Sequence, residues 1–99
     1  MVLDLTKYPG KIPIILTKHP GSDVPLLKKS RYLVNADVSV GEFIFLLRNM
    51  LKIKASDAIF IYCAGTLLSG TEIIERIWSK YRNLDNVLYI TYSAESAFG

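Results

Sequence analysis

The 99-residue sequence is poor in the residues that build disulfide frameworks and metal sites, with one cysteine, Cys63, and one histidine, His19. A single cysteine cannot form an intrachain disulfide, which favours a reducing, cytoplasmic location. These two residues cannot complete a zinc site, and we expect neither a metal nor a cofactor. The pair also lacks a third group to orient a nucleophile, so we predict that the protein is not an enzyme.

Long apolar runs and targeting signals are also missing. The apolar run at residues 58–64 is far shorter than the roughly 20 residues of a membrane-spanning helix. The opening MVLDLTKYPGK lacks a basic region followed by an apolar stretch and a small-residue cleavage site, so we expect no secretory signal. The glycine-containing stretch GTLLSG (65–70) lacks the Lys-Ser/Thr pair that completes a phosphate-binding loop.

Basic charge is in slight excess, with 12 Lys and Arg against 9 Asp and Glu, and it gathers at residues 26–33 and at Arg48, Lys52 and Lys54. Such clusters fit a solvated face, or a surface that attracts acidic peptides or anionic lipid. They are not interleaved with aromatic residues in the manner of nucleic-acid stacking platforms, so we expect no nucleic-acid partner.

The content of 51% hydrophobic residues suits one compact domain over residues 1–99. Residues 11–19 are β-branched and apolar and precede a Pro-Gly turn, which predicts a strand. Residues 30–37 alternate as a second strand does, giving a hairpin with a long loop. The apolar run 58–64 predicts a central strand, residues 65–70 a loop, and residues 86–92 the last strand.

Two helices are predicted between these strands. Ser39 can cap the first helix with Glu42 as its capping-box partner, and Phe43, Leu46, Leu47 and Met50 follow at helical spacing. From residue 71 a second, short helix is indicated by apolar residues at helical spacing up to residue 81.

The order strand, strand, helix, strand, short helix, strand predicts an α+β, ubiquitin-like β-grasp with a four-stranded mixed sheet and the main helix across one face. Right-handed crossovers place the first and last strands side by side and parallel at the centre. The last strand then sends residues 93–99 away from the globule as a flexible tail. Gly99, without a side chain, lets a terminal carboxylate enter a narrow cleft and be activated as an acyl group, and Phe98 could anchor its recognition.

Several segments resemble a known family. KYPGKIPII (7–15), KKSRYLVNADVSVGEFIFLLR (28–48), DAIFIY (57–62) and LYITYSAESAFG (88–99) are similar to the corresponding segments of the autophagy-related protein 8 family, the GABARAP-like ubiquitin-like modifiers. The resemblance runs from Lys7 to the end of the chain.

The resemblance implies a lipid-conjugated modifier of autophagy. An autophagy cysteine protease trims any extension after Gly99, and activating and carrier enzymes pass Gly99 on as thioesters. The glycine ends as an amide on phosphatidylethanolamine, so the protein would be cytoplasmic and, when lipidated, on the autophagosome membrane. The family uses aromatic residues at the positions of Phe60 and Tyr62 in conjugation, although a central strand would bury one face in any case.

The resemblance also implies two pockets for cargo receptors whose short acidic-aromatic motif adds a strand beside residues 30–37. The aromatic pocket would involve Pro13, Arg31, Leu33 and Val87. The aliphatic pocket would involve Tyr32, Val34, Val38, Phe43, Leu46 and Leu47, with Arg48 near the flank of the peptide. Lys28, Lys29, Arg31 and Arg48 would favour acidic residues beside the motif. Helix burial equally predicts that at least two of Val34, Phe43, Leu46 and Leu47 are core residues.

Relatives carry two short helices before the Tyr-Pro dipeptide. Here six residues precede Lys7, so we expect these helices to be largely absent and the aromatic pocket to be shallower. Two alternatives stay open. One is a modifier like autophagy-related protein 12, joined to a protein lysine, and the other is an unconjugated β-grasp adaptor that only binds peptides.

Overall fold

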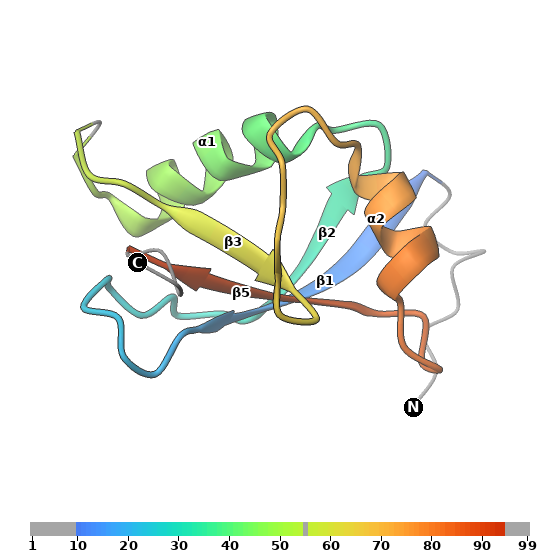
Figure 1. Cartoon of the computed structure of the whole chain (residues 1–99), viewed down its shortest axis with the longest axis horizontal. Coiled ribbons are helices and arrows are strands. Elements are labelled where there is room, and N and C mark those ends of the chain that lie inside the picture. The colour runs from blue at the N-terminus through green and yellow to red at the C-terminus, as the bar shows by residue number, and fades with distance from the viewer. Residues whose placement is uncertain (1–9, 55, 95–99) are drawn as a thin grey trace.

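The computed structural model describes residues 10–54 and 56–94. Five strands and two helices follow one another in the order β1 (Lys11–Lys18), β2 (Arg31–Asn35), α1 (Val40–Leu51), β3 (Phe60–Cys63), β4 (Thr66–Leu67), α2 (Ile74–Tyr81) and β5 (Leu88–Ser93). The strands form one sheet in the order β2-β1-β5-β3-β4 (Figure 1). The expected near-absence of N-terminal helices concerns residues 1–9, which lie outside the described residues.

The centre of the sheet is the parallel pair of β1 and β5, in which Ile14 pairs with Leu88 and Lys18 with Tyr92. All other strand pairs are antiparallel. The β-grasp fold and the central position of the first and last strands are thereby confirmed. Most of the buried apolar residues of the sheet lie on β1, β5 and β3, because each of these strands has a neighbour on both sides.

One element differs from the prediction of four strands, since Thr66–Leu67 form a fifth strand where a loop was expected. The turn before it has two successive residues in the left-handed region, Ala64 at φ 51° and Gly65 at φ 78°. Two positive φ angles match the twist of a tight hairpin. Alanine is not a residue that marks such a turn in a sequence, so the hairpin between β3 and β4 was missed.

Helix α1 begins with the predicted capping box. The Ser39 hydroxyl accepts a hydrogen bond from the Glu42 N–H at 3.1 Å, and the Glu42 carboxylate accepts one from the Ser39 N–H at 3.4 Å. Helix α2 has no side-chain cap and begins at Ile74, three residues later than predicted. The helix begins later because the Glu72 N–H donates to the Ser69 carbonyl at 3.1 Å, and this hydrogen bond closes a separate turn before the helix.

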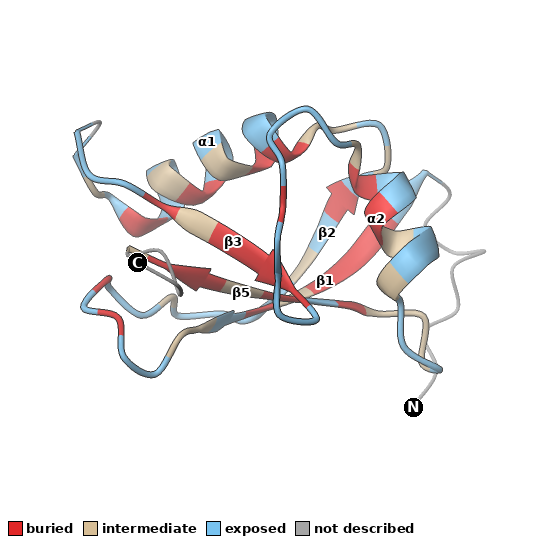
Figure 2. Ribbon diagram, in the orientation of Figure 1, coloured by how far each residue is buried: buried red, intermediate tan, exposed pale blue. Residues whose placement is uncertain are grey.

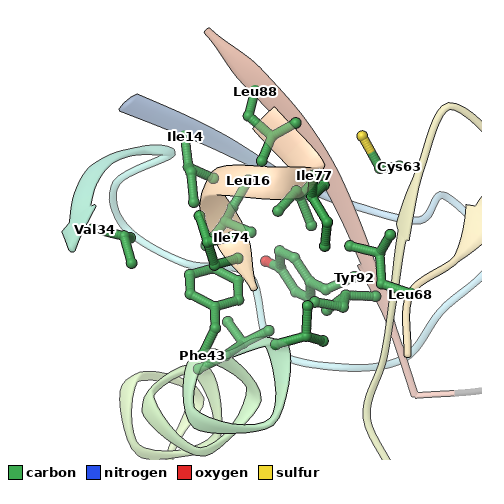
Figure 3. Close-up of a cluster of buried hydrophobic side chains, with 14 of the residues drawn as sticks. Ile14, Leu16, Val34, Phe43, Cys63, Leu68, Ile74, Ile77, Leu88 and Tyr92 are labelled. Atoms are coloured by element: carbon green, nitrogen blue, oxygen red, sulfur yellow. The ribbon is translucent and has the colours of Figure 1, made fainter. Parts of the chain in front are cut away.

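Both helices pack on the same face of the sheet (Figures 1 and 2). Phe43 of α1, Ile74 and Ile77 of α2 and Leu16 and Tyr92 of the sheet lie in one apolar cluster (Figure 3). Alternate residues of β1, β2 and β5 therefore point towards the helices, and the residues between them point to the opposite face, which we call the outer face. Neither described helix is long and apolar enough to cross a membrane.

The phenol of Tyr92 is almost fully buried, with 1% of its surface exposed. Its oxygen accepts a hydrogen bond from the Leu27 N–H at 3.2 Å and lies 3.5 Å from the Pro25 carbonyl, to which the hydroxyl donates. The long loop between β1 and β2 is therefore fastened to the centre of the sheet.

Candidate functional site

Strand β2 forms one edge of the sheet. Two backbone hydrogen bonds flank its pairing with β1: the Leu16 N–H donates to the Ser30 carbonyl at 2.7 Å, and the Ala36 N–H donates to the Gly10 carbonyl at 2.8 Å. In an antiparallel pair the backbone groups of every second residue point to the partner strand. The even-numbered residues of β2 therefore face β1.

The odd-numbered residues of β2 direct their backbone groups away from the sheet. The Asn35 carbonyl accepts a hydrogen bond from the Val38 N–H at 3.2 Å and is occupied. Arg31 and Leu33 present an N–H and a C=O each to the open edge, and no strand of the described residues pairs with it. Such an edge can accept an added strand.

On the outer face, the register brings the predicted aromatic-pocket residues together. Leu33 pairs with Pro13, and Val87 immediately precedes Leu88, which pairs with the residue after Pro13. Leu33 has 44% of its surface exposed, Pro13 is buried and Val87 is half-buried. The three form an apolar row that starts at the open edge, with Arg31 in the adjacent row.

That adjacent row contains two residues that sequence reasoning missed, Ile15 and Tyr89, which pair with each other while Ile15 also pairs with Arg31. The Tyr89 hydroxyl donates to the Asp85 carboxylate at 3.0 Å. This hydrogen bond, with smaller effects of burial and of the Asp85 charge, raises the pKa of Tyr89, while Arg31 opposes the rise. The alternation along 88–93 was the signal that could have placed Tyr89 on the outer face.

On the helix face, the predicted aliphatic-pocket residues divide into core and surface. Phe43 and Leu47 have 1% and 0% of their surface exposed, and Val34 is also buried. Val34 and Phe43 lie within the apolar cluster in Figure 3. These three are core residues, which agrees with the expectation that at least two members of this set belong to the core. They can support a pocket from beneath but cannot line its opening.

The accessible part of this side consists of Tyr32, Val38 and Leu46. Leu46 has 47% of its surface exposed, and Tyr32 and Val38 are half-buried. The Tyr32 hydroxyl donates to the Lys29 carbonyl at 2.7 Å, which fixes the ring beside β2. Burial, and to a lesser degree Tyr92, raises the pKa of Tyr32, so this phenol is neutral at physiological pH.

Arg48 contacts the loop that follows α1. Its guanidinium donates to the Lys54 carbonyl at 3.3 Å and also to the Asp57 carbonyl. Residues two apart on a helix do not share a face, so Arg48 does not lie beside the exposed Leu46. Arg48 thereby fastens the loop after α1, and its place near the flank of a peptide on β2 stays a prediction.

The predicted conjugation residues lie elsewhere. Phe60 and Tyr62 pair with Ser93 and Thr91 of β5 and so share the outer face of the sheet. Phe60 is half-buried, and Tyr62 is buried with 5% of its surface exposed. Their part in conjugation stays a prediction, and Phe98 and Gly99 lie outside the described residues.

Comparison with known proteins identifies the family. Residues 4–99 match the family model described as autophagy protein Atg8, ubiquitin-like. The chain belongs to the Atg8 family. It is 41% identical over 93 residues to autophagy-related protein 8a of Arabidopsis thaliana, covering 94% of this chain and 76% of that protein. Autophagy-related protein 8 of Dictyostelium discoideum is 41% identical over 95 residues, covering 95% and 78%.

The fold agrees with the sequence match. The crystal structure of Trypanosoma brucei Atg8 superposes with a TM-score of 0.89 at 36% identity, covering 96% of this chain and 82% of that one. As an Atg8 family member, the protein is a ubiquitin-like protein of autophagy. The resemblance seen in the sequence is confirmed.

Proposed function

We propose that this Atg8 family protein is a modifier that is attached through Gly99 to phosphatidylethanolamine on autophagosomal membranes and recruits cargo receptors through the edge of β2. The observation that carries the proposal is the family match over residues 4–99, which includes the closing Phe98-Gly99. A cysteine protease and the activating and carrier enzymes of the pathway are its conjugation partners. The protein is cytoplasmic before conjugation and acts on the autophagosome membrane afterwards.

The receptor segment binds as an added strand. Its backbone pairs with the outward N–H and C=O groups of Arg31 and Leu33, and its side chains point alternately to the two faces of the sheet. An aromatic side chain enters the outer-face row at Leu33 and Pro13, and an aliphatic one rests on the helix face beside Leu46. Two anchors on opposite faces must differ by an odd number of positions, and a difference of three positions gives an aromatic-x-x-aliphatic motif.

The charges around this edge favour acidic motifs. Lys28, Lys29 and Arg31 lie at or just before β2 and are exposed. Exposed charges of this kind mainly raise the association rate and set the preferred partner, and contribute less to the lifetime of the complex. Acidic residues beside the aromatic anchor therefore speed binding.

The test is reconstitution with the purified chain, the activating and carrier enzymes, ATP and phosphatidylethanolamine liposomes, read by intact mass. We expect a mass gain equal to the lipid less one water in the parent chain, since amide formation releases water, and none in the Gly99→Ala variant. A thioester on the enzymes without a lipid adduct would indicate a protein acceptor, as for autophagy-related protein 12. No thioester at all would leave an unconjugated peptide-binding adaptor.

A further inference from the structure

The second edge of the sheet, β4, borders a groove that the proposed function does not use. The groove has a volume of about 440 Å³ and lies between β4 and α2. Thr66 and Leu68 line it from the β4 segment, and Arg76, Ile77 and Lys80 line it from α2. In Figure 1, the segment from β4 rises in front of the sheet and the chain returns through α2 beside it. Leu68 and Ile77 are buried and give the groove an apolar floor.

The backbone of β4 is prepared for an added strand. Tyr62 pairs with Leu67, and the Leu68 N–H donates to the Ile61 carbonyl at 3.0 Å. Successive residues of a strand direct their backbone groups to opposite sides. Because Leu68 bonds to β3, the Leu67 N–H and C=O point away from β3. Within the described residues β4 is the last strand of the sheet on this side, so these groups face an open edge.

The rim of the groove is basic. Arg76 and Lys80 are four residues apart on α2, so they lie on one face of the helix, and both are exposed. Among the described residues neither forms an ion pair, and the ammonium of Lys80 lies 5.2 Å from the centre of the Tyr81 ring. Glu72 is the carboxylate among the lining residues. Two cations against one carboxylate leave the groove complementary to an acidic ligand.

We infer that an extended acidic segment of a partner protein docks in this groove as a strand added to β4. Its backbone pairs with Leu67, an apolar side chain covers Leu68 and Ile77, and its carboxylates meet Arg76 and Lys80. A membrane surface could use the two cations, but it offers no backbone for the strand edge and no side chain for the recessed floor. Because β1, β5 and β3 separate β4 from β2, both edges can be occupied at once.

The test uses the isotope-labelled, unconjugated chain and the synthetic peptide acetyl-Glu-Asp-Val-Glu-Val-Asp-Glu-amide, followed by NMR titration. We expect the largest shifts at the amides of Leu67, Leu68, Arg76 and Lys80. The double variant Arg76→Ala/Lys80→Ala should bind about threefold to thirtyfold more weakly, as the loss of two exposed ion pairs implies. The charge-matched control Lys28→Ala/Lys29→Ala, which alters the β2 edge, should change the affinity much less.

A second pair of variants tests the added strand itself. Leu67→Pro removes an outward N–H and no ladder bond, so it should abolish binding while Leu67→Ala retains it, with both spectra otherwise native. Shifts confined to β2 and α1, or equal losses in the two double variants, would overturn the inference. So would binding to phosphatidylserine vesicles without binding to the peptide. None of these outcomes depends on Gly99, so failure here is distinguishable from failure of the conjugation proposal.

Discussion

Ser22 lies in the loop between β1 and β2, where the sequence suggested no role for it, yet it is buried with 3% of its surface exposed. Its hydroxyl accepts a hydrogen bond from the Ala94 N–H at 2.9 Å and lies 3.4 Å from the Val24 nitrogen, which also donates to it. Its carbonyl accepts one from the Lys18 ammonium at 2.7 Å. A single side chain thereby joins the loop to the residue that follows β5.

Replacing Ser22 with alanine should destabilise the protein. Two backbone N–H groups lose their acceptor at a site with little access to water, and each such loss costs about 1 kcal/mol or more. We expect the free energy of unfolding in urea to fall by about 1–3 kcal/mol. The matched control is Ser79→Ala on the exposed side of α2. Equal stability of the two variants would mean that water replaces the Ser22 hydroxyl without cost.

Cys63 is buried, with 3% of its surface exposed, and burial raises the pKa of its thiol from 9.0 to about 11. The unfolded thiol therefore ionises at lower pH than the folded one. The resulting stabilisation is complete below pH 9.0, and it is lost as the pH rises towards about 11.

This difference predicts a pH-dependent contribution to stability. Between about pH 8 and pH 10.5, the free energy of unfolding should fall more steeply in the parent chain than in Cys63→Ala, which lacks the thiol. Urea titrations across this range measure both slopes. All other side chains are common to the two proteins, so their contributions cancel in the comparison. Parallel slopes would show that the folded thiol ionises like an unfolded one.

The single-residue features are the ones that the sequence predicted least well. Alternation correctly separated Tyr32 and Val34 from Leu33, because period-two burial is set by strand geometry alone. The contacts of Arg48 and Ser22 could not be foreseen, since each joins groups that come together only through tertiary packing. The alternation of the last strand also places Tyr89 on the outer face.

At the scale of elements, the sequence predicted both helices and four of the five strands, because their caps and periodic apolar residues are local signals. The boundaries of α1 agree with the box formed by Ser39 and Glu42. The structure departs from prediction where no side chain marks a boundary, at the Ala64 turn and at the uncapped start of α2. The division of the candidate pocket into core and surface residues also needed the packing of α1 on β2.

The capping box provides a test of how much α1 depends on its first turn. Ser39→Ala removes the acceptor for the Glu42 N–H and should lower the free energy of unfolding by about 0.5–2 kcal/mol. Ser56→Ala, at an exposed position, should change it very little. A null effect at Ser39 would mean that tertiary packing alone holds the first turn of α1.

The edge of β2 provides a test of receptor binding. Leu33→Asp places a carboxylate in the outer-face row and should weaken binding of an acidic aromatic-x-x-aliphatic peptide by at least about tenfold, since it removes an apolar contact and repels acidic residues. Calorimetric titration measures the change. Leu67→Ala, at the other edge of the sheet, is the control. If both variants bind like the parent chain, the motif does not bind at β2.

At the scale of the whole molecule, the fold is held together by pairing between its two ends, since residues 14–18 pair with residues 88–92. Contacts this distant in sequence slow folding. We therefore expect refolding from urea on the millisecond-to-second scale. The fluorescence of Trp78 can monitor it, because its indole N–H donates to the Asn86 carbonyl at 2.8 Å and its ring lies 4.5 Å from the Arg82 guanidinium in the folded protein. Refolding in microseconds would contradict a transition state that contains the central pair.

The parallel pair of β1 and β5 also governs what happens while the chain is being synthesised. The ribosome delivers β1, β2 and both helices first, but β1 has no central partner until β5 emerges. Until then the apolar strand that carries Ile12, Ile14 and Leu16 has one unpaired edge, which is the kind of surface that aggregates or binds chaperones. A nascent chain stalled before Leu88 therefore leaves this edge of β1 open, and only a chain that completes its last strand can close the sheet.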